Sequence, residues 1–220
     1  MTELLKGADA FYAKPDELRA LALRSTYHTI DGSYGFRSPT GILLPGTLDQ
    51  IRTAFGFTKI KLFPEWMGTR CFYHSFQQGE SRESFYAHTD GVGRAGSVDY
   101  SLIVYLTPDA PRQSGTGVFR HKATGIWQAP TAADAKQLGL SRAKLRKLLE
   151  DDAKRSDRWE LLDSADNVYN RAILFPSHWY HSGLNYFGDC LGNGRLYQAF
   201  FFRARPDVFA TLPSPTNVPQ

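Results

Sequence analysis

The chain has 220 residues, enough for one folded domain with a sizeable core. A hydrophobic fraction of 42% and an aromatic fraction of 14% exclude extensive disorder. The formal net charge of +4 permits a polyanionic partner without requiring one. No apolar run approaches the roughly 20 residues that span a bilayer, and residues 1–14 carry charges where a signal peptide has an apolar core.

Two cysteines, Cys71 and Cys190, lie far apart in the sequence and form no CxxC pattern. This usage is not that of a disulfide scaffold or a structural zinc site. Together with the lack of a membrane segment, it leads us to expect a cytoplasmic protein without a membrane partner. The sequence does not predict an oligomeric state.

Two helices are expected near the N-terminus. A proline followed by two acidic residues at 15–17 is typical of a first helical turn, and apolar residues then repeat at helical spacing. Residues 47–55 predict a second short helix, capped by Thr47 and ended by Gly56. We expect residues 1–58 to form a helical support for the rest of the chain.

From residue 59 the apolar period changes to two, which indicates strands rich in aromatic residues. The clearest buried strand covers residues 99–107. Helices first, followed by about eight short strands, predict an α+β protein with a jelly-roll core over residues 59–205. The other strand segments are 59–62, 71–76, 85–88, 118–121, 170–175 and 195–202.

Residues 131–160 interrupt the strands with an amphipathic pattern, in which leucines, Trp159 and Leu161 alternate with charged residues. We expect a helix or helix pair inserted into the core domain and packed on its sheet. Residues 206–220 are expected to form a loose tail, so that residues 1–220 make a single domain. The basic stripe of the insertion is typical of a solvated helix face, with nucleic-acid contact as the less favoured alternative; it comprises Arg142, Lys144, Arg146 and Lys147.

The segment His88-Thr89-Asp90 follows an aromatic strand. Residues two apart on an extended strand point to the same side, so one imidazole nitrogen and one carboxylate oxygen can reach a single cation. Two histidines and one carboxylate form the facial triad of non-haem Fe(II) oxygenases, which leaves coordination positions open. A three-residue pattern is weak alone, and its meaning depends on a later histidine.

Two histidines, His178 and His181, follow the strand that ends at Pro176. His181 is favoured as the third ligand, whereas His178 is interpreted as a surface or supporting group and stays an alternative. Arg195 then opens the last strong strand. Its planar guanidinium can bind a carboxylate through two parallel hydrogen bonds, and a buried arginine needs an anionic partner.

In this pattern the chain resembles the 2-oxoglutarate- and Fe(II)-dependent dioxygenases, in particular their prolyl-4-hydroxylase-like branch. The resemblance covers roughly residues 60–205, and the 131–160 insertion lengthens the gap between Asp90 and His181. It is carried, in order, by His88-Thr89-Asp90, Tyr100 to Thr107, Phe175 to Gly183, and Arg195 before Ala199-Phe200-Phe201-Phe202.

The resemblance implies a double-stranded β-helix in which His88, Asp90 and His181 bind iron. It further implies that Arg195 holds the C5-carboxylate of 2-oxoglutarate, with help from Tyr105. The implied activity uses Fe(II), 2-oxoglutarate and O2 to hydroxylate a C–H bond of an amino acid, a peptidyl group or a small metabolite, releasing succinate and CO2.

Two alternatives stay open: a cupin-like metal-dependent enzyme that is not an oxygenase and does not need Arg195, and a basic jelly-roll module that binds nucleic acid. The residues Tyr73 and His74 have no assigned role, although one of them is expected to face inward. His121 is interpreted as a solvated strand end. The insertion and the loop at 91–96 are expected to cover the substrate.

Overall fold

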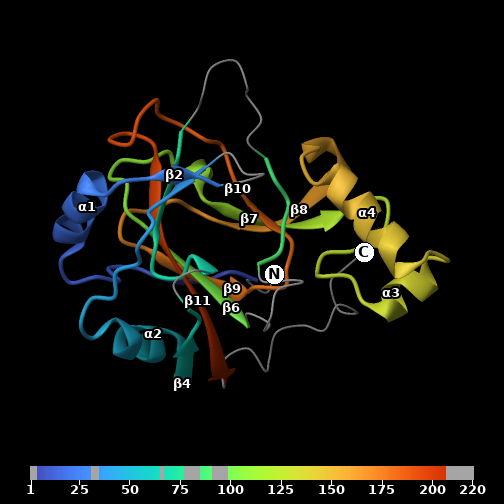
Figure 1. The fold of residues 1–220 in the computed structure, drawn as a ribbon, viewed down its shortest axis with the longest axis horizontal. Helices are drawn as coiled ribbons and strands as arrows, with labels where there is room; N and C mark the ends of the chain where they lie inside the picture. Colours follow the sequence, from blue (N-terminus) through green and yellow to red (C-terminus); the bar gives the residue numbers. More distant parts are fainter. Residues whose placement is uncertain (1–3, 31–34, 65–66, 77–84, 91–98, 207–220) are drawn as a thin grey trace.

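The computed structural model describes most of the chain, and Figure 1 shows its course. The described residues are 4–30, 35–64, 67–76, 85–90 and 99–206. The predicted loop at 91–96 and the predicted tail after residue 206 lie outside them. Within the described residues, no helix combines the length and the apolar character that crossing a bilayer requires.

Antiparallel pairing builds two sheets. The larger has the strand order β1-β9-β6-β11-β5-β3-β2, with β4 also paired to β11, and the smaller has the order β10-β7-β8. The strands of the larger sheet are β1 (Lys6–Ala8), β2 (His28–Thr29), β3 (Phe36–Arg37), β4 (Phe57–Leu62), β5 (Phe72–Ser75), β6 (Tyr100–Tyr105), β9 (Ala172–Pro176) and β11 (Arg195–Pro206). Those of the smaller sheet are β7 (Thr116–His121), β8 (Trp159–Ala165) and β10 (His181–Gly183).

The chain passes repeatedly between the two sheets. It leaves the larger sheet after β6, forms β7 and β8 in the smaller one, returns as β9, crosses again as β10 and ends in β11. Such alternation between two facing antiparallel sheets is a jelly roll. The predicted α+β architecture with a jelly-roll core is therefore confirmed.

All six residues of β6 are buried, because both faces of this central strand are covered. Leu102 and Val104 point into a core shared with the N-terminal helices. Ile103 and Tyr105 point the other way, into a core shared with β7 and β9. The period-two alternation of a strand thus separates two apolar layers, and the second layer lies between the sheets.

The helices α1 (Pro15–Arg24) and α2 (Thr47–Phe55) lie on one side of the larger sheet, as Figure 1 shows. The acidic residues that follow Pro15 occupy the first turn of α1, as expected. Gly56 ends α2 in a left-handed conformation, which confirms that prediction. The assignment of Thr47 as the cap was wrong: Gly46 takes that position and Thr47 is the first helical residue.

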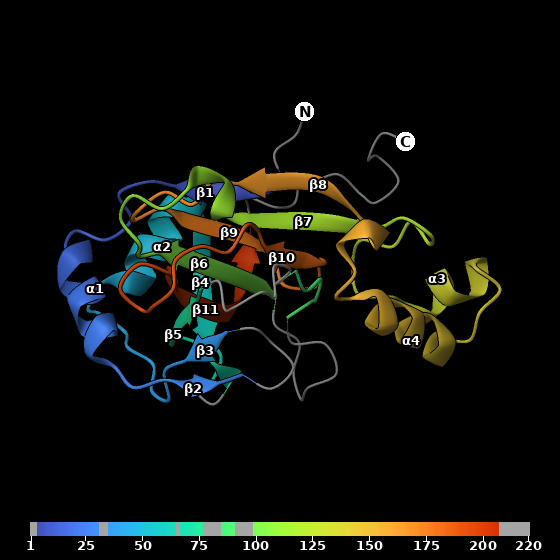
Figure 2. The same cartoon turned by 90° about the horizontal axis from the view of Figure 1, so that it is seen from above.

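The insertion forms α3 (Ala132–Gln137) and α4 (Arg142–Asp152). Two short 3-10 turns lie nearby in the chain: η2 (Arg112–Ser114) precedes β7, and η3 (Ser156–Arg158) follows α4. Figure 2 shows both helices beyond the ends of β7 and β8, on the side away from α1. The predicted helix pair is confirmed, but Trp159 and Leu161 were wrongly included in it. Both belong to β8, because Trp159 pairs with His121 and Leu161 with Phe119.

Apolar residues of the insertion pack against the outer face of the smaller sheet. Leu145 and Leu149 of α4 share a core cluster with Phe119 and Trp159. The opposite face of α4 is exposed, and Lys147 forms an ion pair with Asp151 there. The basic stripe thus lies on a solvated face with acidic neighbours, as the sequence indicated.

Truncation of Leu102 tests whether β6 is the centre of the packing. We expect Leu102→Ala to lower the free energy of unfolding by about 2–5 kcal/mol, because a buried cavity would replace its side chain. Leu161→Ala, at a site 49% exposed, should cost less than about 1 kcal/mol. Chemical denaturation measures both; equal losses would contradict the assigned core.

Candidate metal centre

Three side chains converge where the smaller sheet meets the segment that precedes Asp90. One ligand atom from each of His88, Asp90 and His181 lies within 4.8 Å of the others. Nε2 of His181 lies 3.3 Å from Oδ2 of Asp90, and Nε2 of His88 lies 3.8 Å from Oδ1 of Asp90. These separations suit one divalent ion with bonds of about 2.0–2.2 Å to each ligand.

Backbone pairing positions the two imidazoles. His88 and His181 face each other across an antiparallel bridge and exchange hydrogen bonds of 3.1 Å and 2.9 Å. Residues paired in this way carry their side chains on the same face of the sheet. The Asp90 amide donates to the carbonyl of Ser177 at 2.8 Å, which brings the carboxylate to the same place.

The outer nitrogen of each imidazole is held by a backbone carbonyl. Nδ1 of His88 lies 2.9 Å from the Tyr86 oxygen, and Nδ1 of His181 lies 2.9 Å from the Trp179 oxygen. A carbonyl only accepts, so Nδ1 donates in both cases, and the neutral form of each imidazole carries its lone pair on Nε2. Both histidines are therefore prepared to bind a cation through Nε2, the nitrogen that faces Asp90.

Electrostatics also favours a cation. Burial, followed by repulsion from His181, lowers the pKa of His88 to about 4. Burial alone raises the pKa of Asp90, but His181, His88 and the Ser101 hydroxyl stabilise its carboxylate and bring that pKa down to about 2. Near neutral pH His88 is uncharged and Asp90 is ionised. The His88 side chain is 38% exposed, so the site is open on that side.

Arg195 is a buried cation at the first position of β11, only 3% exposed. Its Nε donates to the Ser114 carbonyl at 3.2 Å, and its Nη2 donates to the Gly115 carbonyl and to Thr116 Oγ1 at 3.3 Å and 3.0 Å. Over the described ranges, no carboxylate lies within ion-pair distance of this guanidinium. An unpaired buried charge is costly, so the position suits an anionic ligand.

Tyrosine rings line the space around Arg195. Its guanidinium carbon lies 4.5 Å from the ring centre of Tyr197 and 5.5 Å from that of Tyr105. The Tyr105 hydroxyl shares a 2.8 Å hydrogen bond with Thr116 Oγ1, which also contacts the arginine. Tyr105 and Arg195 therefore belong to one hydrogen-bonded cluster, linked through Thr116.

Tyr197 was missed in the sequence, although its spacing of two from Arg195 predicts that both point to the same face of β11. Its ring stacks on Tyr73 with centroids 5.3 Å apart. Burial is the main reason that the pKa of Tyr197 is raised to about 12, and the Asp90 carboxylate contributes to the same rise. Tyr197 thus belongs to the aromatic lining beside the arginine.

Gly183 lies on the same strand as His181 and is a close neighbour of the Arg195 side chain. A Cβ at Gly183 would lie 3.5 Å from the Arg195 guanidinium carbon and 3.0 Å from the Tyr186 hydroxyl. Residues 181 and 183 share one face of β10 because they are two apart. The guanidinium therefore lies next to the strand position that follows His181 on the inner face.

The other candidate residues lie elsewhere. His178 is exposed and outside the three-residue cluster. Tyr73 faces the site, whereas His74 lies on the opposite face of β5, stacked on Phe36 with ring centroids 4.8 Å apart. The interpretation of His121 as a solvated strand end was wrong, because α4 covers it and its side chain is fully buried.

A family described as "Family of unknown function (DUF6445)" matches residues 62–202. No curated protein matches the chain.

Among solved structures, the chain is similar to HygX from Streptomyces hygroscopicus with nickel and 2-oxoglutarate bound, at 12% identity and a TM-score of 0.47 over 91% of this chain and 83% of that one. It is also similar to a Pseudomonas putida prolyl-4-hydroxylase, at 15% identity and a TM-score of 0.43 over 93% and 95% of the two chains. EctD from S. alaskensis, with 2-oxoglutarate and 5-hydroxyectoine, gives 15% identity and a TM-score of 0.41 over 91% and 71%. None of these likenesses assigns an activity to this chain.

Removal of the Ser101 hydroxyl tests how Asp90 is held. Ser101 Oγ donates to Asp90 Oδ2 at 2.6 Å, so we expect Ser101→Ala to raise the pKa of Asp90 and to weaken divalent-metal binding about 10-fold. Calorimetric titration with Ni(II) measures the affinity, and Ser164→Ala, at an exposed site on β8, is the control. Unchanged affinity in Ser101→Ala would show that this hydrogen bond does not organise the site.

Proposed function

Because the chain belongs to the family of unknown function DUF6445, we propose its function from the site itself: an Fe(II)- and 2-oxoglutarate-dependent oxygenase that hydroxylates a C–H bond. The observation that carries the proposal is the convergence of two Nε2 atoms and one carboxylate, with both imidazole tautomers fixed by backbone carbonyls. The proposal treats residues 1–220 as one cytoplasmic domain and the substrate as an amino acid, a peptidyl group or a small metabolite.

The donor set fits iron. Two neutral imidazoles and one carboxylate on one side of an ion leave the opposite side for other ligands, which is the arrangement typical of non-haem Fe(II). Asp90 contributes one negative charge, and the Nδ1 hydrogen bonds of His88 and His181 leave Nε2 of each ring as the ligand atom. A closed zinc site with four protein ligands does not match, since three candidate ligand residues form the cluster within the described ranges.

The group around Arg195 fits the distal carboxylate of 2-oxoglutarate. A guanidinium fork binds a carboxylate through parallel hydrogen bonds, and a buried cation gains most from such a partner. The Tyr105 hydroxyl and Thr116 Oγ1 are close enough to the guanidinium to complete the binding of an anion. Arg195 and Tyr105 would therefore hold the cosubstrate, and His88, Asp90 and His181 would hold the metal.

When bound, iron and 2-oxoglutarate supply the activation of O2, with release of succinate and CO2. The protein's own residues would bind these two groups and orient them. Asp90 balances part of the metal charge, and the two histidines keep fixed orientations through their Nδ1 hydrogen bonds. The rings of Tyr73, Tyr105 and Tyr197 reduce the space for water beside the arginine. The open side at His88 is where a substrate would approach.

The two histidines that follow β9 provide a matched test of the metal ligands. We expect His181→Ala to weaken Fe(II) binding by about 100-fold or more and to abolish iron-dependent succinate formation, because one of three ligands is lost. His178→Ala, at an exposed site three residues earlier, should bind and turn over like the wild type. Anaerobic calorimetry and succinate detection measure the two effects; full turnover in His181→Ala would sink the assignment.

Substitution of Arg195 tests the cosubstrate. Loss of a buried charged contact with a carboxylate costs about 2 kcal/mol or more, so Arg195→Gln should raise the 2-oxoglutarate concentration at half-saturation about 30-fold or more. Metal affinity should remain close to that of the wild type. Undiminished activity in Arg195→Gln would favour a cupin-like enzyme that does not use the dicarboxylate, whereas salt-sensitive nucleic-acid binding without iron dependence would identify a binding module.

A further inference from the structure

His121 is a buried polar residue that the metal centre does not contact. Its side chain is fully buried at the end of β7, with Nδ1 2.9 Å from Thr124 Oγ1 and Nε2 3.1 Å from Asp152 Oδ2. The imidazole ring also lies 5.0 Å from the Trp159 ring. Both ring nitrogens are therefore engaged, and one of them joins the smaller sheet to the last residue of α4.

Asp152 fixes the end of α4 through several contacts besides His121. Its backbone carbonyl accepts a 2.8 Å hydrogen bond from the Trp159 indole nitrogen, and Oδ1 lies 3.4 Å from Arg155 Nη1. Trp159 opposes His121 in the β7–β8 ladder. The end of α4 is consequently attached to both strands of this hairpin.

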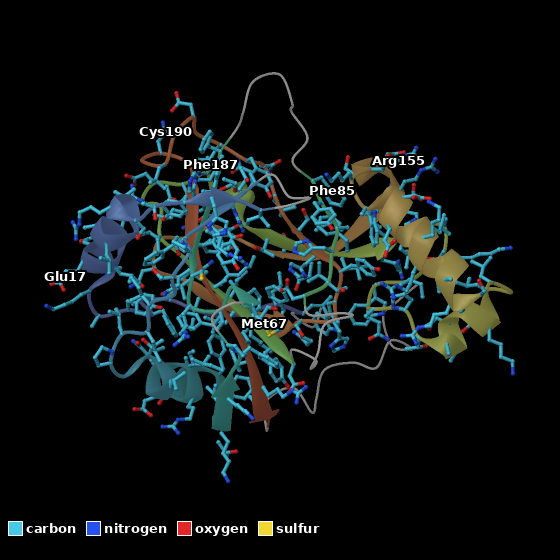
Figure 3. The ribbon with its side chains drawn as sticks, viewed as in Figure 1. Glu17, Met67, Phe85, Arg155, Phe187 and Cys190 are labelled. Carbon is cyan, nitrogen blue, oxygen red and sulfur yellow. The ribbon has the colours of Figure 1, made fainter. Side chains whose placement is uncertain are left out.

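The next residue of the insertion reaches the segment that carries the metal ligands. The Ala153 carbonyl accepts a 2.8 Å hydrogen bond from the amide of Ala87, directly before His88. Ala153 and Ala87 are both buried, so this bond is shielded from water. Phe85 and Arg155, labelled in Figure 3, mark the two neighbouring segments that this bond joins.

This bond matters because, within the part of the chain that the structure describes, residues 85–88 pair with a strand only at His88. On one side they are joined to β10 by the single His88–His181 bridge, and the Tyr86 amide donates to Ser182 Oγ at 3.1 Å. His181, in contrast, lies in β10, which pairs with β7 over three residues. Among the described contacts, the His88 backbone has fewer strand pairings than that of His181, and the Ala153 carbonyl provides a contact on the other edge of this segment.

Side-chain contacts also connect the end of the insertion to the His88 imidazole. Lys154 Nζ lies 5.7 Å from the centre of the Tyr86 ring. The Tyr86 ring stacks on the His88 ring with centroids 5.0 Å apart and planes 10° apart. Ala153 thus contacts the backbone beside His88, and Lys154 contacts the ring that stacks on it.

We propose that His121 is a positioning residue for the metal centre: by holding Asp152, it keeps the Ala153 carbonyl against Ala87 and so fixes the backbone and ring of His88. This inference rests on the proposed metal site. It gives the α3–α4 insertion a role in metal binding besides covering the smaller sheet.

Two substitutions of His121 separate the hydrogen bond from the packing. His121→Phe keeps a ring but cannot donate to Asp152, whereas the amide of His121→Gln can. In His121→Phe we expect Co(II) affinity to fall about 10-fold, as for other groups that orient a ligand, and the Ala87 amide of the metal-free protein to exchange hydrogen faster. In His121→Gln both quantities should stay within about twofold of the wild type.

A destabilised control excludes a general structural effect. Leu18→Ala removes a buried side chain of α1, which packs on the other side of the larger sheet. Its Co(II) affinity should match that of the wild type, and so should the rate at which the Ala87 amide exchanges hydrogen through local opening, without global unfolding. If His121→Phe does not fold, Asp152→Ala must show the same two changes, because it removes the partner carboxylate from the end of α4.

The outcomes distinguish the two proposals. Wild-type affinity and unchanged Ala87 exchange in a folded His121→Phe or Asp152→Ala protein would overturn the positioning role, while the metal site would stand. A wild-type protein that binds no Co(II), Ni(II) or Fe(II) would overturn the metal site, and the Ala87 exchange would still show whether His121 orders this segment. A change in the Co(II) visible spectrum of His121→Phe supports altered ligand geometry.

Discussion

The antiparallel bridge between His88 and His181 is the constraint on which the site depends. Two backbone hydrogen bonds across this bridge place both imidazoles on one face, and two further bonds from Nδ1 to carbonyls turn each Nε2 toward Asp90. The ligands are thus oriented by the main chain. The jelly roll brings together strands that are far apart in the sequence, and a metal would bind where they meet.

The same arrangement has electrostatic costs that a ligand set can offset. Burial opposes the ionisation of Asp90, and Arg195 is a buried cation without a carboxylate partner in the described chain. A dication at the triad and a dicarboxylate at the arginine would each remove one of these costs. Tyr197, two positions after Arg195 on β11, packs its ring against the guanidinium, 4.5 Å from the guanidinium carbon to the ring centre.

Much of this could be predicted from the sequence, because strand periodicity is local. The spacing of His88 and Asp90 predicts a shared face, and the alternation around β6 predicts a buried central strand; both follow from period-two geometry. The same rule would have found Tyr197 from Arg195. The sequence favours His181 over His178, and this choice stays a prediction; in the structure His181 pairs with His88 across the bridge.

The remaining features depend on contacts between distant residues. The position of His121 at a strand end predicts a solvated side chain, because nothing in its sequence neighbours shows that α4 covers it. Trp159 fits a helical apolar pattern, yet cross-strand pairing with His121 places it in β8. Thr47 is a common cap residue, but Gly46 precedes it in a left-handed conformation that a threonine does not readily adopt. For His121 and Trp159 contacts between distant residues overrode the local pattern, and for Thr47 the conformation of the preceding glycine did. The most direct test of the account is the anomalous diffraction of iron in a crystal grown anaerobically with Fe(II) and 2-oxoglutarate. We predict one iron peak bonded to Nε2 of both histidines and to the Asp90 carboxylate, with a 2-oxoglutarate carboxylate on Arg195. An iron bound at His178, or bound through Nδ1 of either triad histidine, would contradict it.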